Sequence, residues 1–214
     1  YLADKYNIEV IETELTDSQK DDNNLKEKLF LICDFVKNYF KTQFNESNFG
    51  RTIAGAYFEE RGFEDDTLKK FEIGSLGNEK HNLRDHCLSK GYNIDDLKAL
   101  GLVSSKTQMD IYRSRLIFPI KSISGRTVGF GARILDNNKK SAKYINSPDS
   151  KIYNKSNILF GLYNSKNEIV KKDNCLIAEG YTDVMRFHQI GINNIVSSSG
   201  TALTVNQINL IRRL

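Results

Sequence analysis

The sequence lacks the long hydrophobic runs, the paired cysteines and the N-terminal leader that mark several common protein classes. Its longest apolar runs, such as residues 29–33 and 116–120, are far shorter than the roughly 20 residues that a membrane span requires. The three cysteines, Cys33, Cys87 and Cys175, form no CxxC pair, which argues against a zinc site and against a disulfide framework. The first residues mix charged with apolar side chains and match neither a signal peptide nor a transit peptide. We therefore expect a cytoplasmic protein that does not enter a membrane.

What the sequence does contain is enough apolar residues for a folded protein. Of the 214 residues, 39% are hydrophobic and 27% are charged, which is too apolar for disorder and sufficient for one sizeable core or two small ones. The net charge of +4 is unevenly distributed: residues 113–155 carry ten Lys or Arg and two acids, hence +8, and the remaining residues carry −4. Such a segment favours a polyanionic partner, namely nucleic acid or nucleotides, although a solvated basic face explains the charge alone equally well.

The spacing of apolar residues and glycines divides the chain into three parts. Residues 1–24 are predicted to be an N-terminal helical segment and, at Thr16–Asn24, an exposed linker without apolar residues. Residues 25–170 are predicted to form a basic subdomain that opens with an amphipathic helix and continues with short helices that end at glycines. Residues 171–214 follow a different pattern and form the third part.

Two β-rich runs, Arg115–Ile120 and Arg126–Leu135, occur in the second part and are separated by a turn that contains Gly125. This arrangement predicts an antiparallel hairpin, with the glycine in a backbone conformation that other residues resist. Gly129 and Gly131 remove side chains from one face of the second run. The two glycines therefore permit a bulge or the close approach of a ligand backbone.

The third part alternates between strands and helices. The predicted elements are a buried-type strand at Cys175–Ala178, a helix at Tyr181–Ile190, a strand at Asn194–Ser198, and a helix at Thr204–Leu214 opened by a Thr204–Gln207 capping box. This alternation predicts a parallel sheet with helices. The fold class is therefore α/β: an α+β N-terminal subdomain with an antiparallel hairpin, followed by the beginning of a parallel α/β sheet.

A carboxylate lies at the point where the first of these strands ends. Glu179 and Gly180 follow the strand, and Asp183 is three residues into the helix. Open α/β sheets bind ligands at this edge, so Glu179 could hold a divalent cation that bridges phosphates, or could transfer a proton. Capping of the helix is the structural alternative. A single carboxylate makes a weak metal site, and residues 197–214 supply no further acid.

The basic segment combines cations with groups that recognise bases and sugars. In an extended strand, Arg113 and Arg115 would point to one face and present two guanidiniums to adjacent phosphates. Tyr144 and Asn146 offer ring stacking and hydrogen bonds to a base, a sugar or a nucleotide. Each of these residues also has an ordinary structural explanation, such as an ion pair, core packing or a turn. Further cations in the same segment are Arg133, Lys143 and Lys155.

The remaining candidates carry weaker signals. The histidines His81, His86 and His188 lack the acid and nucleophile spacing of a catalytic triad and are predicted to be surface or packing residues. The segment Ser197–Thr201 lacks the glycines and the lysine of a Walker phosphate loop. It is therefore predicted to be a strand-to-helix turn that borders the crevice.

Taken in order, these motifs resemble those of a known family. The runs RSRLIFPI, GRTVGFGAR, KYINSPDSKIYNKSNILFGL, IAEGYTDV and SSSGTALT resemble the RNA polymerase domain of bacterial DnaG-type DNA primases, and YFEERGFEDDTLKKFEIG resembles its helical part. The resemblance extends over about residues 39–214 and implies an N-terminal subdomain, the start of a Toprim subdomain, and a shallow basic groove leading to a metal site. One departure is Ala132, which stands where the family usually has glycine.

The resemblance also implies roles for individual residues. Glu179 corresponds to the first Toprim acid, a catalytic ligand of Mg²⁺ or Mn²⁺, and Asp183 is a second candidate ligand. The implied nucleotide contacts are Arg133, Lys143, Tyr144, Asn146 and Gly180. The implied nucleic-acid contacts are Arg61, Arg113, Arg115, Arg133, Lys143 and Lys155.

A member of this family would synthesise short RNA primers from nucleoside triphosphates on single-stranded DNA and would hold the resulting RNA primer–DNA hybrid. Its zinc-binding module would precede Tyr1, whereas its Asp-x-Asp metal motif and the domain that contacts the replicative helicase would follow Leu214. The sequence by itself is therefore expected to be an inactive part of the catalytic core. Two alternatives remain: a non-catalytic single-stranded nucleic-acid-binding module, in which Glu179 and Asp183 only cap a helix, and another Toprim enzyme, such as a nuclease or a primase-helicase.

Overall fold

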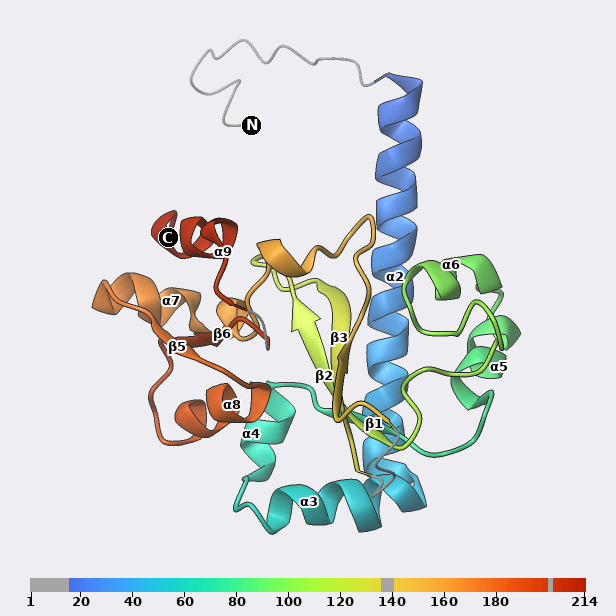
Figure 1. Ribbon diagram of the computed structural model, residues 1–214, viewed down its shortest axis with the longest axis horizontal. Helices are drawn as coiled ribbons and strands as arrows, with labels where there is room; N and C mark the ends of the chain where they lie inside the picture. The colour runs from blue at the N-terminus through green and yellow to red at the C-terminus, as the bar shows by residue number, and fades with distance from the viewer. Residues whose placement is uncertain (1–15, 136–140, 200–201) are drawn as a thin grey trace, which may run out of the picture.

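A single long helix organises the N-terminal part of the protein (Figure 1). The structure is a computed structural model that describes residues 16–135, 141–199 and 202–214, so the helical segment expected before Thr16 lies outside the described residues. Helix α2 (Asp17–Glu46) is 30 residues long. The apolar stripe expected from the sequence is confirmed, because the residues that α2 buries recur at helical spacing. These residues are Leu29, Ile32, Cys33, Val36, Tyr39 and Phe40.

The linker predicted at Thr16–Asn24 is wrong, because these residues form the first turns of α2. Thr16 caps the helix in a capping box with Gln19, in which each side chain accepts a hydrogen bond from the backbone of the other residue. Asp22 forms an ion pair with Lys151, at 3.0 Å. An exposed helical segment of this kind needs no apolar residue, since its cap and its ion pairs supply the interactions that a buried face would otherwise provide.

The sheet beside α2 is antiparallel and follows the order of the chain. Its strands are β1 (Gly74–Leu76), β2 (Arg115–Lys121), β3 (Thr127–Ile134) and β4 (Tyr144–Asn146). The predicted hairpin is confirmed: Arg115 pairs with Ile134 and Lys121 with Thr127, and Gly125 in the turn has φ +93°. Strand β4 extends the sheet beside β3, and this pairing brings Tyr144 opposite Arg133.

Short helices surround α2 and connect it to the sheet. They are the π-helix η1 (Gly50–Ala54), α3 (Gly55–Glu59), α4 (Asp65–Lys70), α5 (Asn82–Ser89) and α6 (Ile94–Ala99). Helices α5 and α6 lie beside α2, on the side away from β2 and β3 in Figure 1. None of the helices in the described ranges is long and apolar enough to cross a membrane.

The C-terminal part contains a second sheet, which is parallel and consists of β5 and β6. The elements of this part, in chain order, are the 3₁₀ helix η2 (Lys155–Asn157), α7 (Leu162–Lys172), β5 (Leu176–Ala178), α8 (Tyr181–Gln189), β6 (Ile195–Ser197) and α9 (Val205–Arg212). The predicted alternation, the parallel pairing of β5 with β6 and the capping box at Thr204 are confirmed. Strand β5 is not of the buried type that we predicted. Leu176 is 43% and Ile177 is 45% exposed, and because successive residues of a strand point to opposite faces, the described part of the chain leaves both faces of β5 partly uncovered.

The two faces of the antiparallel sheet pack against different partners. Ile117 and Phe130 belong to the core that α2 covers. Leu116 and Phe118, on the other face, join a second core that contains Tyr181 from α8. The antiparallel sheet therefore connects α2 with the C-terminal part, and the chain has the α/β class expected from its sequence.

The glycines of β3 admit side chains rather than a ligand backbone. A bulge does occur beside Gly129, as one of the two expectations allowed. The other expectation is wrong: a Cβ at Gly131 would lie only 2.4 Å from the ring of Tyr181, so that ring fills the space. Ser147 and Tyr153 fill the space beside Gly129 in the same way.

Candidate nucleotide and nucleic-acid site

A cavity of about 370 Å³ lies between β4 and the start of α8, and we call it the β4–α8 pocket. It is lined by Tyr144, Asn146, Glu179, Gly180, Tyr181, Thr182, Asp183 and Ser199. Five of the residues implied by the sequence therefore surround one cavity. Glu179 follows β5 and Ser199 follows β6, so the pocket lies at the carboxyl ends of the two parallel strands, where open α/β sheets bind ligands.

The two acids of the β4–α8 pocket have different surroundings. Asp183 Oδ2 accepts a hydrogen bond from the backbone N–H of Gly180 at 3.0 Å, so this carboxylate caps α8. Glu179 is exposed, and its carboxylate makes no hydrogen bond or ion pair with any residue in the described ranges. Its backbone carbonyl accepts from Ser197 Oγ at 2.8 Å, which ties the turn after β5 to β6. The structural alternative therefore describes Asp183, whereas Glu179 remains free to bind a ligand.

These two carboxylates fit part of a divalent cation site. Mg²⁺ and similar hard cations take oxygen ligands and often share them with substrate phosphates. Glu179 and the remaining oxygen of Asp183 lie on the same cavity and offer such ligands. Among the described residues there is no group of three or more His, Cys, Asp or Glu side chains that could hold a metal ion. The donors present therefore match a cation that obtains its other ligands elsewhere.

Asn146 connects the β4–α8 pocket to a cation. An ammonium can only donate, so the amide oxygen of Asn146 faces Lys155 Nζ at 3.2 Å, and the amide nitrogen donates to the Tyr181 hydroxyl. Burial raises the pKa of Tyr181 to about 12, so the phenol stays neutral at physiological pH. Lys155, Asn146 and Tyr181 thus form a connected polar row, of which Asn146 and Tyr181 line the cavity.

Two arginines that the resemblance implicates in nucleic-acid binding meet on one tyrosine ring. The Arg61 guanidinium lies 3.9 Å and the Arg133 guanidinium 4.6 Å from the centre of the Tyr57 ring. Arg133 Nη1 also donates to the hydroxyls of Tyr57, at 2.5 Å, and Tyr144, at 3.1 Å. We call Tyr57, Arg61, Arg133 and Tyr144 the arginine cluster. Because Tyr144 also lines the β4–α8 pocket, the cluster and the pocket are contiguous.

The sequence analysis missed Tyr57 of the arginine cluster, as well as Tyr181 and Thr182 of the pocket lining. Tyr57 is buried, and burial raises the pKa of its hydroxyl although the nearby arginines act in the opposite direction. Its position four residues before Arg61 is a helical spacing that could have suggested a contact. Its contact with Arg133, 76 residues away, has no local signal in the sequence.

The expectation that Arg113 and Arg115 extend from one face of a strand is wrong. Arg113 lies in a turn before β2, and Ser114 between them adopts a left-handed conformation with φ +54°. Arg115 is buried and donates to the carbonyl of Ala142 at 3.0 Å, which holds the segment just before Lys143. Arg113 is partly exposed and donates to the carbonyl of Asp110 at 3.1 Å. The two guanidiniums therefore perform different tasks.

Lys143 is exposed directly before β4, and its ammonium has no hydrogen-bond or ion-pair partner within residues 16–135, 141–199 and 202–214. The backbone carbonyl of Lys143 accepts from the N–H of Ile134 at 3.0 Å, which fixes its position next to β3. Its charge is therefore available to an anionic ligand beside the arginine cluster.

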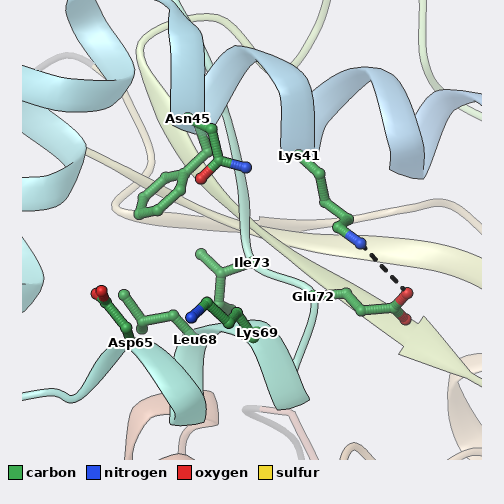
Figure 2. A pocket seen from close by; sticks show the side chains of 8 residues that line it. Lys41, Asn45, Asp65, Leu68, Lys69, Glu72 and Ile73 are labelled. Atoms are coloured by element: carbon green, nitrogen blue, oxygen red, sulfur yellow. Dashed lines mark ion pairs between the residues drawn. The ribbon is translucent and has the colours of Figure 1, made fainter.

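A second, smaller pocket of about 120 Å³ lies between α2 and α4 (Figure 2). It is lined by Lys41, Phe44, Asn45, Asp65, Leu68, Lys69, Glu72 and Ile73. The ammonium of Lys41 and the carboxylate of Glu72 are 3.8 Å apart, and Glu72 also pairs with Lys121 at 2.5 Å. None of the predicted site residues lines this pocket, and Glu72 is already neutralised. The β4–α8 pocket is therefore the stronger candidate.

The structure also places two of the weaker candidates from the sequence, His188 and the turn that follows β6. His188 is buried, and its Nε2 lies 3.0 Å from Ser165 Oγ, which in turn donates to the carbonyl of Ile195. Ser199 contributes to the β4–α8 pocket, so the turn after β6 does border the crevice. The last two residues of that turn, 200 and 201, lie outside the described residues.

Comparison with known families places the chain in a class that combines such a basic sheet with a Toprim unit. Residues 39–166 match the family described as the N-terminal domain of the DNA primase catalytic core, and residues 173–214 match the Toprim domain. The chain therefore belongs to the DNA primase catalytic core family. The resemblance seen in the sequence motifs is confirmed.

Individual relatives are bacterial primases. The whole chain is 37% identical to a DNA primase of Clostridium acetobutylicum, of which it covers 35%. The RNA polymerase domain of Mycobacterium tuberculosis primase DnaG is 33% identical, with a TM-score of 0.81 over 87% of this chain and 61% of that chain. A DnaG primase catalytic domain bound to single-stranded DNA is 30% identical, with a TM-score of 0.81 over 89% of this chain and 61% of that chain. The chain spans about a quarter to a third of the length of the curated relatives.

Proposed function

We propose that the natural protein is a primase that synthesises RNA primers from nucleoside triphosphates on single-stranded DNA. Family membership supports this proposal, as does the relative whose catalytic domain is bound to single-stranded DNA. The observation that carries it is the contiguity of the β4–α8 pocket with the arginine cluster through Tyr144. Template-directed synthesis needs a site for nucleotide chemistry next to a surface that holds a polyanion, and these residues provide both.

The nucleoside triphosphate would occupy the β4–α8 pocket. Helix α8 begins at Tyr181, which lines the pocket, and the N-terminus of a helix favours phosphate binding. Lys155, whose ammonium lies 3.2 Å from the amide oxygen of Asn146, would neutralise a phosphate beside that residue. The ring of Tyr144, which is 42% exposed, offers a surface on which a base can stack.

The template would lie across the arginine cluster and Lys143. Arg61 and Arg133 are fixed by Tyr57, so they lose little conformational freedom when they bind phosphates. Lys143 adds an exposed charge, and Arg115 supports it by holding the preceding residue. Binding of this kind depends on phosphate neutralisation and falls steeply as salt rises.

A divalent cation, Mg²⁺ or Mn²⁺, would supply charge stabilisation for phosphoryl transfer when it is bound. Glu179 would hold it with a free carboxylate, and Asp183 would contribute the oxygen that does not cap Gly180. Asp183 also keeps the turn after β5 in place, which orients Glu179 toward the cavity. These two acids therefore differ in their expected contributions, and Glu179 is the essential one.

The test is to change Glu179 to glutamine in the natural full-length protein and to measure primer synthesis and template binding separately. We expect synthesis to be lost, while the dissociation constant for single-stranded DNA changes less than twofold. Glu168→Gln is the matched control, because Glu168 lies on α7 and forms only 3.7 Å ion pairs with Lys171 and Lys172. Equal losses of synthesis and binding in Glu179→Gln would contradict a role confined to the chemistry.

The capping hydrogen bond of Asp183 favours a second candidate, a non-catalytic module that binds single-stranded nucleic acid. In that case the full-length protein would bind DNA with the same salt dependence but would synthesise no RNA with any divalent cation. A Toprim nuclease would instead cleave the template. The same assay, with the template labelled, separates the three outcomes.

A further inference from the structure

Helix α8 reaches from the β4–α8 pocket to the backbone that carries Arg61. Its first turn holds Asp183 at the pocket, and Arg186 and Gln189 follow at intervals of three residues. Arg186 Nη1 donates to the carbonyl of Gly62 at 2.7 Å, and Nη2 donates to the carbonyl of Arg61. Gln189 Nε2 donates to the carbonyl of Gly62 at 2.9 Å. Two side chains of the Toprim part therefore hydrogen-bond to one turn of the N-terminal part.

The turn after α3 has a backbone conformation that presents its carbonyls to Arg186 and Gln189. Gly62 has φ +66°, a conformation that glycine adopts at little cost and that turns the chain sharply at the end of the helix. The amide of Gln189 holds the same turn a second time, since the N–H of Glu64 donates to Gln189 Oε1 at 3.0 Å. The Arg186 guanidinium also lies 5.0 Å from the centre of the Phe63 ring. Arg186 and Gln189 thus fix the turn by hydrogen bonds and by ring packing together.

These contacts form a closed ring that begins and ends at the pocket. Helix α8, which starts at the pocket, carries Arg186, and Arg186 donates to the backbone carbonyl of Arg61. The Arg61 side chain leads through Tyr57 to Arg133. Arg133 returns to the pocket through the hydroxyl of Tyr144. Few groups along this closed ring can move alone, because each is tied to its neighbours by hydrogen bonds or aromatic contacts.

We propose that Arg186, with Gln189, is a positioning residue that sets the template-binding Arg61 at a fixed place relative to the β4–α8 pocket. The proposal rests on the proposed function, because it assigns Arg61 to the phosphates of a single-stranded polyanion. Arg186 itself acts through the turn. Both of its terminal nitrogens donate to carbonyls of this turn, so we expect its contribution to template affinity to depend on Arg61.

The test is a double-mutant cycle in the natural full-length protein. The variants are Arg61→Met, Arg186→Met and the two combined, and the probe is a short single-stranded DNA oligonucleotide whose dissociation constant is measured at several salt concentrations. We expect each single variant to bind about tenfold more weakly, the loss typical of one charge-assisted hydrogen bond. The slope of log affinity against log salt should fall by about 0.7 in each, as for one lost phosphate contact on a single strand.

The combined variant carries the decisive result. If Arg186 acts through Arg61, the combined variant binds no more weakly than Arg61→Met alone. Lys171→Met is the control, because it removes one positive charge from an exposed position on α7 whose nearest acid is 3.7 Å away, and its binding should equal that of the wild type. Arg186→Lys, which can donate from one nitrogen only, should give an intermediate affinity.

Three results would overturn the proposal. Additive losses in the combined variant would show that Arg186 contacts the template independently or acts only through general stability. Unchanged binding in Arg186→Met, with weakened binding in Arg61→Met, would refute the positioning role and leave the proposed function intact. Unchanged binding in Arg61→Met would remove Arg61 from the template surface, and both the positioning role and that part of the proposed function would fall. Melting temperatures of all variants identify a loss of folding, and Arg186→Lys then decides the case.

Discussion

Gly131 lies where β3 passes directly beneath the ring of Tyr181, so one added methyl group at this position tests how the sheet supports the pocket. A Cβ there would lie 2.4 to 2.5 Å from the Cζ, Cε2 and hydroxyl oxygen of Tyr181, which is far inside van der Waals contact. The backbone of Gly131 does not have positive φ, so the cost of Gly131→Ala comes from this collision and not from backbone strain.

The Tyr181 ring has little freedom to move away. It is 4% exposed, stacks on Phe118 at 5.0 Å between ring centres and meets the edge of Phe160 at 4.6 Å. Overpacking of a close-packed core costs about 1–3 kcal/mol, and loss of the hydrogen bond between Tyr181 and Asn146 adds about 0.5–1.5 kcal/mol. Replacement of a strand glycine by alanine returns about 0.5–1 kcal/mol. We expect Gly131→Ala to lower the free energy of unfolding by about 2 kcal/mol, the middle of these combined ranges.

Urea denaturation measures this change, with Gly55→Ala as the matched control. Gly55 begins α3 with φ −63°, and its added Cβ would meet only the carbonyl oxygen of Gly50 at 3.5 Å, so this variant should be neutral or stabilised by about 0.5–1 kcal/mol. Tyr181→Phe removes only the hydroxyl and should cost about 1 kcal/mol. An unfolding free energy for Gly131→Ala within about 0.5 kcal/mol of the wild type would refute the reasoning.

Three further predictions concern stability. Burial lowers the pKa of His188 to about 4 from 6.5, so the folded protein binds fewer protons than the unfolded chain between these values. The free energy of unfolding should therefore fall by up to about 3 kcal/mol as pH drops from 6.5 to 4. Thermal unfolding of His188→Gln should lack this pH-dependent loss. Identical pH profiles for the variant and the wild type would contradict the prediction. Thr16→Ala should cost the first turn of α2 about 1 kcal/mol and accelerate amide hydrogen exchange at residues 17–20, whereas unchanged exchange would argue against a capped helix there. Phe40→Ala, at a fully buried position, should lower the free energy of unfolding in chemical denaturation by about 3–5 kcal/mol. Leu31, on the same helix, is 64% exposed, so Leu31→Ala should change that free energy by less than about 0.5 kcal/mol. Similar values for the two variants would disprove the assigned faces of α2.

Features that depend on neighbours within a few residues could be predicted from the sequence. The apolar stripe of α2, the hairpin turn at Gly125 and the capping box at Thr204 each require only local spacing, and the structure contains all three. The order of the motifs also indicated the primase family, which the comparison confirms. The gathering of Glu179 and Gly180 at a ligand-binding edge followed from the general rule for strand ends in parallel sheets.

The errors occur where distant residues change the meaning of a local pattern. Thr16–Asn24 lacks apolar residues, yet it is helical, and Lys151 provides an ion pair from far along the chain. The apolar residues of β5 predicted burial, but burial depends on what covers a strand and not on the strand itself. Arg113 and Arg115 were expected to share one face of an extended strand, whereas the left-handed Ser114 separates Arg113 from β2.

The sequence by itself determined the elements with a strong local pattern and the chemical groups that the protein carries, because helical and strand periodicities and cap residues act over short distances. Only the tertiary structure decided which groups meet. A guanidinium has several equivalent donors, and nothing in the sequence specifies whether they bind phosphate, the Tyr57 ring, or, as for Arg186, the carbonyl of a residue 124 positions away. Such pairings depend on the packing of α8 and the antiparallel sheet around Tyr181, which brings distant parts of the chain into contact.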